Sequence, residues 1–492
     1  MDLQDIKKKG ISGVFWSLFG KVSTHIVTFI VSIILARLLS PADFGLVGMA
    51  MVFVFFTQTF MDFGLTSAVI QKKDPTETQI NTVFYISIIL GTCLMIAMII
   101  LAPYIGRYYN NPEVAKIARF VSYSFVIHAL TGLQRALLTK QLEMKVLMGI
   151  NIIGAFVQGV SGVVLAYLGY GAWSIVYSTF LNNIITTLIL WIKSSWRPKW
   201  LFNLSEIKGM FMYSYKMFIA GVLNSVYAKL DELIIGKMFS PTALGYYYRS
   251  KSFNNMIVAY TSEGLSSMFF PVISHLQDDI DQIRKIVVKS LEIICFTVFA
   301  LMALLYLDAE SLIVILFGDK WFPSVGYFKV LVFISYAYPV SVVLVNILSG
   351  MGHSGKFLKL EIWKKVIGLS GMFIGFLWGI YGYLWATVVT TAIGVTFNMF
   401  FVSKVIPLKI SEQWKILIKY ALISLGCVIP VWLLNQLLPH NLWLILIVDT
   451  LLFSILYIAV NLSIKTSGFL LLKNIIISKN IGTRLFKFKK GK

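Results

Sequence analysis

Hydrophobic segments of about 20 residues recur along the whole chain, separated by short polar connections. Each is long enough to cross the apolar core of a bilayer as one helix. The first series of windows falls at about 11–38, 43–64, 80–105, 114–134, 147–168 and 171–192. A second series falls at about 210–237, 243–271, 286–307, 325–349, 359–378 and 381–402, and a last pair at about 416–437 and 442–463. The pattern predicts an all-α integral membrane protein of about 14 transmembrane helices.

The composition agrees with this pattern. Hydrophobic residues make up 58% of the chain and charged residues 13%, whereas about 25% of the residues of a soluble domain are charged. Little of the chain remains for a soluble domain. We expect a multi-pass protein of a bacterial inner (cytoplasmic) membrane.

Lysine and arginine residues indicate the orientation. With a cytoplasmic N-terminus, most of the 43 fall in connections on the cytoplasmic side, as the positive-inside rule requires. One of these connections holds Arg135, Lys140 and Lys145. The C-terminus is then cytoplasmic too, and the net charge of +21 reflects topology, so it gives no reason to expect a nucleic-acid partner. A basic tail, residues 466–492, suits a surface of anionic lipid.

The two series of windows resemble each other in sequence. At an offset of 200, the segment 37–45 (Arg-Leu-Leu-Ser-Pro-Ala-Asp-Phe-Gly) aligns with 237–245 (Lys-Met-Phe-Ser-Pro-Thr-Ala-Leu-Gly), and residues 64–67 align with 264–267. We infer an internal duplication with a six-helix lobe at 1–200, a second at 201–405, a helix pair at 406–465 and the tail at 466–492. Parallel repeats of this kind can rock around a central site to give alternating access.

Two short motifs and the layout of six, six and two helices carry a family resemblance. Residues 39–46 (Leu-Ser-Pro-Ala-Asp-Phe-Gly-Leu) and 62–71 (Asp-Phe-Gly-Leu-Thr-Ser-Ala-Val-Ile-Gln) resemble the polysaccharide transporters of the multidrug/oligosaccharidyl-lipid/polysaccharide exporter superfamily, closest to the lipopolysaccharide, O-antigen and colanic-acid flippases. The resemblance implies two six-helix lobes in a V around a cavity, and a polyprenyl-pyrophosphate-linked oligosaccharide as cargo. The implied function is transfer of that cargo to the outer leaflet for surface polysaccharide synthesis.

Cations within the apolar windows are candidates for binding the pyrophosphate. Charge at a helix centre is unfavourable and usually faces a cavity or a partner. The candidates are Lys21, Lys216, Lys229, Arg249 and Lys251. Lys21 and the cations of the second lobe converge if the first, seventh and eighth helices line the cleft, as the resemblance implies. The alternative is that these side chains reach the head groups or pair structurally.

Acidic residues and one histidine are candidates for coupling to protons or sodium ions. They are Asp231, Glu232, Glu263, Asp62 and His25. Glu232 lies three residues after Lys229 on one helical face, so a neutral internal pair is an alternative. Helix capping or interfacial solvation is the alternative for Asp62, Glu263 and also Asp43. The other histidines lack metal-ligand spacing, and we expect neither a metal nor a cofactor.

Two rival functions remain. A membrane-embedded glycan polymerase or ligase ordinarily needs a sizeable extramembrane loop, which this sequence lacks, so we expect no enzyme. An ion-coupled multidrug exporter of the same fold should present acids and aromatic rings to a cationic drug. No Gly-rich loop ending in Gly-Lys-Ser/Thr is present for ATP. Lipids and the glycan are the expected partners of a monomer, and glycan assembly enzymes are further candidates that no motif identifies.

Overall fold

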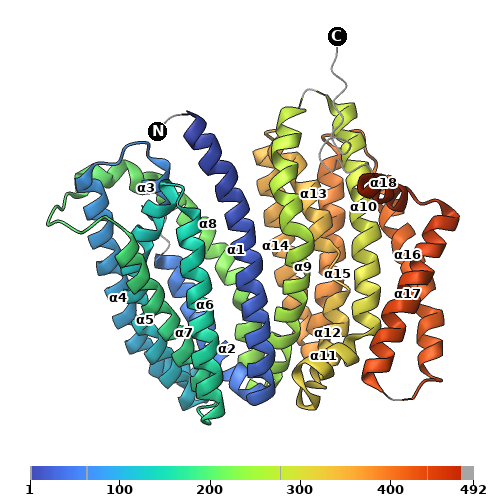
Figure 1. Ribbon diagram of the computed structural model, residues 1–492, viewed down its shortest axis with the longest axis horizontal. Helices are drawn as coiled ribbons and strands as arrows, with labels where there is room; N and C mark the ends of the chain where they lie inside the picture. The colour runs from blue at the N-terminus through green and yellow to red at the C-terminus, as the bar shows by residue number, and fades with distance from the viewer. Residues whose placement is uncertain (1–2, 62–64, 278, 440, 478–492) are drawn as a thin grey trace. The chain divides into compact units, whose positions relative to one another are not determined.

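The structure is a computed structural model of the 492-residue chain and describes residues 3–61, 65–277, 279–439 and 441–477. All regular secondary structure in these ranges is helical. The chain divides into two compact units, Met1–Tyr248 and Arg249–Lys492. Figure 1 labels the helices of both units.

The first unit contains a bundle of long helices and ends within the first turns of α9. Its helices are α1 (Leu3–Leu38), α2 (Pro41–Met61), α3 (Leu65–Gln71), α4 (Glu77–Tyr109), α5 (Pro112–Lys140), α6 (Met144–Tyr167), α7 (Ala172–Lys193), η1 (Leu204–Ile207), α8 (Lys208–Met238) and the start of α9 (Pro241–His275). This division by packing lies about two turns into α9. The boundary at 200/201 was inferred from sequence repeats and not from packing, and it stays a prediction.

The second unit contains the rest of α9 and the remaining helices. They are α10 (Ile280–Leu307), α11 (Ala309–Phe317), η2 (Asp319–Trp321), α12 (Ser324–Val332), α13 (Ala337–Gly350), α14 (Ser354–Phe376), α15 (Gly379–Ser403), α16 (Ile410–Asn435), α17 (Leu442–Ile464) and α18 (Ser467–Ile477). The helix pair α16 and α17 corresponds to the last two apolar windows.

Eight helical segments of the described chain are long and apolar enough to cross a membrane. They include α4, α6, α7, α10, α15, α16, α17 and the combined segment Ser324–Gly350. Shorter apolar helices occur at Ser23–Leu38 and Pro41–Thr57. The chain is therefore a membrane protein with multiple apolar helices, and the count of 14 spans stays a prediction.

Local sequence signals explain several helix ends. Thr76 and Gln79 form a capping box at the start of α4, with the Thr76 hydroxyl accepting from Gln79 N at 3.2 Å. At the other end Asn110 adopts the left-handed conformation, with φ 53°. Asn111 then caps α5, which begins with Pro112. The run Asn-Asn-Pro thus ends one helix and starts the next within three residues.

The predicted single span at 325–349 is divided in the structure. Helix α12 ends at Val332 and α13 begins at Ala337, with turns between them. Pro339 explains the break because its ring lacks an N–H and would clash with the carbonyl of residue 335 in a continuous helix. Pro339 lies inside the apolar window, so hydropathy alone does not reveal the break.

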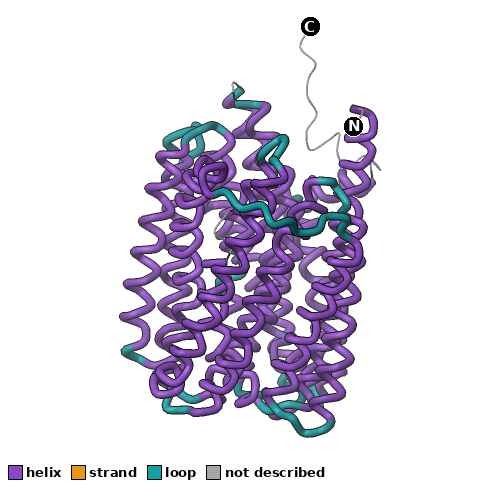
Figure 2. Tube along the Cα trace, turned by 90° about the vertical axis from the view of Figure 1, so that its left-hand side faces the viewer, coloured by secondary structure: helices purple, strands orange, loops and turns teal. Residues whose placement is uncertain are grey.

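The connection between α7 and α8 is held against α4. Lys199 N donates to Asn81 Oδ1 at 2.6 Å, and Asn203 N donates to Thr82 Oγ1 at 3.0 Å. Both acceptor residues, Asn81 and Thr82, are fully buried. Figure 2 shows a long loop lying across the helices on this side of the chain. The segment that joins the two predicted lobes is therefore fixed to the first unit.

The two segments that align at an offset of 200 pack against each other. Pro41 and Pro241 are the first residues of α2 and α9, a position that suits proline. A Cβ at Gly45 would lie 1.7 Å from the Pro241 carbonyl oxygen, and one at Gly245 would lie 1.9 Å from the Pro41 carbonyl oxygen. Only glycine permits this approach. The contact is reciprocal, as a two-fold relation between two copies would make it.

Candidate functional site

A cavity of about 730 Å³ lies among the helices of the first unit. Residues of α1, α3, α4, α5, α6 and α7 line it. Its volume is in the range of about 300–1,000 Å³ that is typical of ligand pockets. Because these helices form one compact unit, the cavity belongs to that unit alone.

The lining of this cavity is polar, although the helices around it are apolar overall. Amide side chains come from α6 and α7, namely Asn151, Gln158, Asn182 and Asn183. Hydroxyl groups come from Thr24, Thr28, Thr66, Ser87, Thr131, Thr139 and Thr186. Polar side chains of membrane helices are unfavourable in contact with lipid. They are typical of a cavity that holds water or a polar ligand.

Arg135 supplies the charge of the cavity. Its Nη1 donates to Asn151 Oδ1 at 3.2 Å, a neutral partner. His128 lies seven residues earlier on the same face of α5 and lines the cavity too, as does His25 of α1. None of the described lining residues is an aspartate or glutamate. The cavity is therefore positive wherever Arg135 is charged.

A chain of amides forms another wall. Gln158 Nε2 donates to Thr179 Oγ1 at 3.1 Å, and Asn182 Nδ2 donates to Gln158 Oε1 at 3.2 Å. These bonds fix the orientation of the Asn182 amide. Its Oδ1 is buried, and within the described part of the chain no donor reaches it. The oxygen is enclosed where α6 and α7 pack together and has almost no accessible surface.

Glycines let the helices approach each other at the cavity. A Cβ at Gly20 of α1 would lie 1.9 Å from Met148 Cγ of α6. A Cβ at Gly154 of α6 would lie 2.3 Å from Asn182 Oδ1 and 2.5 Å from Thr186 Cγ2. Gly154 thus makes room for the side chains of α7 that line the cavity, as small residues do between membrane helices.

Lys229, Asp231 and Glu232 form a paired cluster in the first unit. Lys229 Nζ lies 2.8 Å from both Glu232 carboxylate oxygens, and the Glu232 side chain is 3% exposed. Asp231 accepts hydrogen bonds from Glu232 N and from the Tyr247 hydroxyl. The internal pair that the sequence left as an alternative for Lys229 is present. Roles for these residues in cargo binding or ion coupling stay predictions.

Arg249 lies in the second unit and packs on aromatic rings. Its guanidinium carbon is 3.9 Å from the Phe317 ring centroid and 5.7 Å from that of Trp321, and the residue is 6% exposed. Lys251 follows and is half-buried. Because Arg249 is almost fully buried, its predicted contact with a pyrophosphate needs a local rearrangement.

Other predicted site residues lie outside what the structure describes. Asp62 belongs to the undescribed residues 62–64, and the side chains of Lys21, Lys216 and Glu263 are likewise outside the described part. Their predicted roles stay predictions. Asp43 caps α2 by accepting from Ser40 N at 2.9 Å, and its other oxygen accepts from Ala172 N at 2.9 Å. The capping interpretation of Asp43 is confirmed.

Two buried acids of the second unit were not among the sequence candidates. Asp308 is 3% exposed and Asp449 is fully buried. Thr450 Oγ1 donates to Asp308 at 3.3 Å, and Asn435 Nδ2 donates to Asp449 at 2.8 Å. These contacts connect α16, α17 and the junction between α10 and α11.

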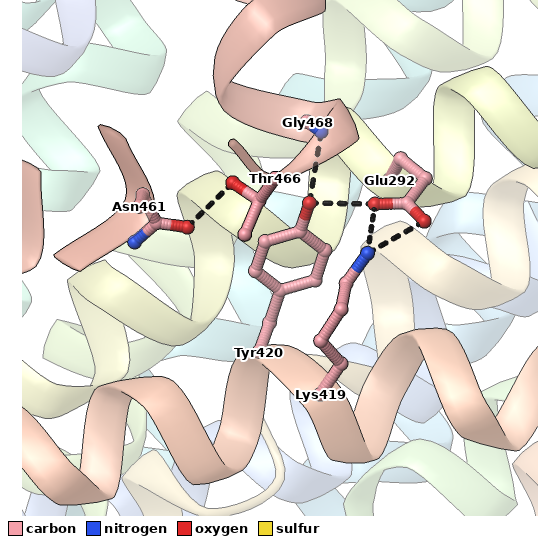
Figure 3. Close-up of polar contacts among 6 residues, drawn as sticks. All are labelled: Glu292, Lys419, Tyr420, Asn461, Thr466 and Gly468. Carbon is pink, nitrogen blue, oxygen red and sulfur yellow. Dashed lines mark hydrogen bonds and ion pairs between the residues drawn. The ribbon is translucent and has the colours of Figure 1, made fainter. Parts of the chain in front are cut away.

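A polar cluster attaches α18 to the second unit (Figure 3). Lys419 Nζ contacts the Glu292 carboxylate at 2.6 and 2.7 Å, and the Tyr420 hydroxyl donates to it at 2.5 Å. The same hydroxyl accepts from Gly468 N, in the first turn of α18, at 2.8 Å. The cluster is an anchor for α18. Within the described residues, no group of three or more His, Cys, Asp or Glu side chains could hold a metal ion.

A family described as "Polysaccharide biosynthesis protein" matches residues 34–326, more than half of the chain. The chain belongs to this family. Two relatives are the lipopolysaccharide biosynthesis protein WzxC of Escherichia coli (strain K12), 22% identical over 75% of this chain and 76% of that protein, and the succinoglycan biosynthesis transport protein ExoT of Rhizobium meliloti (strain 1021), 24% identical over 66% and 64%. The resemblance drawn from the sequence motifs is confirmed.

Solved structures show the same fold. This family member is similar to the lipid II flippase MurJ in an inward closed conformation, with a TM-score of 0.73 and 14% identity over 92% of this chain and 99% of that one. It is also similar to an inward-facing multidrug resistance MATE transporter of the MOP superfamily, with a TM-score of 0.61 and 13% identity over 77% and 95%. At these identities the likeness concerns the fold alone.

The search for charges in the sequence missed the cavity. Arg135 falls near the end of an apolar window and was counted with the cytoplasmic loops, although it lies within α5 and lines the cavity. Asn151, Gln158, Asn182 and Asn183 carry no charge and were not considered. Amides within apolar windows of the same lobe were the available signal.

Proposed function

We propose that this protein is a flippase that moves a polyprenyl-pyrophosphate-linked oligosaccharide from the cytoplasmic to the outer leaflet for surface polysaccharide synthesis. Relatives in its family are named for lipopolysaccharide biosynthesis and succinoglycan transport. The observation that carries the proposal is the polar cavity of the first unit, whose described lining combines Arg135 with amides and hydroxyls and includes no carboxylate.

The chemistry of the cavity favours this cargo over a cationic drug. Amide and hydroxyl groups can both donate to and accept from sugar hydroxyls. An arginine favours carboxylate or phosphate groups and repels a cation. A drug-cation site would call for acids and aromatic faces, and within the described lining the aromatic residues are the two histidines, His25 and His128.

The predicted orientation places the cavity in the half of the bundle nearer the cytoplasm. The lining residues come from the C-terminal part of α5, the N-terminal part of α6 and the second half of α7. With both termini cytoplasmic, those parts are the cytoplasmic halves of their helices. In this proposal the cargo enters from the leaflet in which it is made, and the lobes then alternate around it.

Pyrophosphate binding by Lys21, Lys216, Lys229, Arg249 and Lys251 remains part of the proposal. Coupling to protons or sodium ions through Asp231, Glu232, Glu263, Asp62 or His25 remains part of it too. We place the protein in a bacterial inner membrane as a monomer without a cofactor, and we assign it no enzymatic step. Glycan assembly enzymes remain candidate partners.

The test is cellular. The protein is deleted from cells that depend on it for a surface polysaccharide, and the lipid-linked intermediate and the surface polymer are both measured. We expect a completed intermediate to accumulate on the cytoplasmic leaflet while the polymer disappears. Unchanged polymer after deletion would contradict the proposal, and an incomplete intermediate would point instead to an assembly enzyme.

A second arm tests the residues. Alanine replaces Lys21 and Arg249 in turn, with membrane expression confirmed by immunoblotting. Accumulated intermediate in either variant would support pyrophosphate binding at that cation. Normal surface polymer in both variants would remove these two residues from the proposed site while leaving the flippase function itself in place.

A further inference from the structure

The two buried acids of the second unit form a pair that the proposed function does not use. Asp308 lies at the junction of α10 and α11, and Asp449 lies two turns into α17. They are 3% and 0% exposed, and their carboxyl groups lie within hydrogen-bonding reach of each other. The pair therefore joins segments that are far apart in the sequence.

Each carboxyl group of the pair has a donor for one oxygen only. Thr450 Oγ1 donates to Asp308 Oδ2 at 3.3 Å, and Asn435 Nδ2 donates to Asp449 Oδ2 at 2.8 Å. The Oδ1 atom of each aspartate is buried and accepts from no described group. Both donors are neutral. Two ionised carboxylates here would lack the partners that stabilise buried charge.

The surroundings of the pair supply no positive charge. A buried apolar cluster of α10, α16 and α17, which includes Ala303, Val431 and Phe453, adjoins it. No described lysine or arginine forms an ion pair with either aspartate. The other titratable side chains within about two turns of the pair on the four helices are Tyr306 of α10, Glu310 of α11, Cys427 of α16 and Tyr457 of α17.

A shared proton resolves this arrangement. Two carboxylates in contact repel each other, and burial disfavours the charge of both. One proton between them removes one of the charges and supplies a donor where the Oδ1 atoms have none. A hard metal cation would require about six oxygen ligands, more than the two unpartnered Oδ1 atoms provide. The geometry thus favours a proton over a metal ion.

We propose that Asp308 and Asp449 bind one proton between them and that this proton attaches α17 to the junction of α10 and α11. The inference goes beyond the proposed function and does not depend on the cargo. In the predicted orientation, Asp308 and the half-buried Asn435 lie at the outer ends of α10 and α16. The pair exchanges its proton with that side, and the attachment weakens when the proton is lost.

The sign of the pH dependence follows from counting protons. An unfolded aspartate has a pKa of about 3.9, so the unfolded chain has released this proton above about pH 5, whereas the folded pair retains it. Because the folded protein binds one proton more, its stability falls as the pH rises. The unfolding equilibrium constant should increase up to about tenfold per pH unit until the folded pair ionises.

The experiment titrates the full-length protein in lipid nanodiscs and follows the infrared C=O stretch of protonated carboxyl groups. Unfolding temperatures are measured at the same pH values. At neutral pH, the wild type should show more protonated carboxyl signal than the double variant Asp308→Asn with Asp449→Asn. Its unfolding temperature should also fall more steeply with rising pH. The matched control is Glu310→Gln, which removes an exposed acid of α11 and should behave as the wild type.

A single variant serves if the double variant does not fold. In Asp449→Asn the new amide can donate to Asp308 at every pH, as the shared proton does only below the pH at which the pair ionises. The carboxyl signal and the steep pH dependence should both be lost.

Two results would overturn the inference. The first is a carboxyl signal and a pH dependence that are the same in the wild type and in the asparagine variants. The second is stabilisation of the wild type, but not of the asparagine variants, by sodium chloride relative to choline chloride, without a difference in carboxyl signal. That result would assign the pair to a metal cation. Neither result affects the deletion experiment, so the flippase function can stand while this inference fails.

Discussion

The ion pair of Lys229 and Glu232 places an almost fully buried carboxylate against an ammonium group. Lys229→Met should lower the free energy of unfolding by about 3 kcal/mol, because it removes the Lys229 ammonium group from a buried carboxylate. The double variant Lys229→Met with Glu232→Gln should recover most of that loss. Thermal unfolding in detergent measures both effects.

The same variants separate a structural role from a role in transport. If the pair acts in transport, through the cargo contact proposed for Lys229 or the ion coupling proposed for Glu232, the double variant will be stable and yet fail to deliver surface polymer. If the pair is structural only, the double variant will regain both stability and polymer. A single variant that unfolds no earlier than the wild type would show that the pair contributes little.

Gly154 is the residue whose enlargement tests the cavity most directly. In Gly154→Ala the new methyl group must displace Asn182 or Thr186, because it would lie 2.3 and 2.5 Å from their side chains. We expect surface polymer to fall severalfold, with a stability loss of about 1–3 kcal/mol. Gly149→Ala on the same helix is the control, since nothing lies within 4 Å of its Cβ. Equal behaviour of the two variants would contradict a role for the cavity.

At the residue scale, the sequence identified cations and acids but could not place them. Lys229 and Glu232 follow from helical spacing and do pair. The sequence predicts Arg249 as a cavity cation, whereas its packing on Phe317 and near Trp321 depends on α11 and η2, which are distant in the sequence. The convergence of Arg135, Asn151 and Asn182 depends on how three helices pack, and helix periodicity does not determine that.

The attachment of α18 is the clearest case at the scale of an element. A Cβ at Gly468 would lie 2.4 Å from the Glu292 carbonyl oxygen and 2.6 Å from the Tyr420 hydroxyl. Gly468→Ala should therefore release α18, and hydrogen–deuterium exchange of residues 467–477 should rise at least tenfold. Gly426→Ala on α16 is the control, with nothing within 4 Å of its Cβ.

Tyr420→Phe tests the same attachment from the other side. It removes the acceptor for Gly468 N and the donor to Glu292, so exchange in α18 should rise here too, though less than in Gly468→Ala. Unchanged exchange in both variants would mean that the apolar face of α18 holds it in place without the polar cluster.

Most helices of the described chain could be predicted from the sequence because long apolar windows leave few other structures in a bilayer. The windows at 80–105, 286–307 and 442–463 each lie within one helix of the structure. The short helices α3 and α11 were not predicted. Each contains fewer than ten residues, too few for a hydrophobic period to stand out from the neighbouring spans.

At the scale of the whole chain, the predicted duplication rests on residues at helix starts. Ser-Pro and Gly recur at an offset of 200 because each copy starts a helix with proline and needs glycine one turn later. The sequence could not reveal that these residues touch each other, since an alignment of two copies says nothing about the distance between them.

This contact gives a prediction about the chain as a pair of copies. Gly45→Ala should lower the free energy of unfolding by about 1–3 kcal/mol, because its Cβ would meet a backbone oxygen that no rotamer change can move. Gly245→Ala should lower the free energy of unfolding in the same way. The double variant should lose less than the sum of the two single losses, because both substitutions disrupt the same contact. Gly48→Ala, whose Cβ would meet Leu244 at 3.5 Å, is the control in thermal unfolding.

The reciprocal approach of Gly45 to Pro241 and of Gly245 to Pro41 also constrains how this gene can change. At other positions a substitution in one segment does not have to fit the backbone of the other. At Gly45 and Gly245 each segment contacts the backbone of the other, so a larger side chain at either glycine would clash with a proline carbonyl oxygen of the other segment. A substitution at either glycine is therefore limited by the backbone of the other segment.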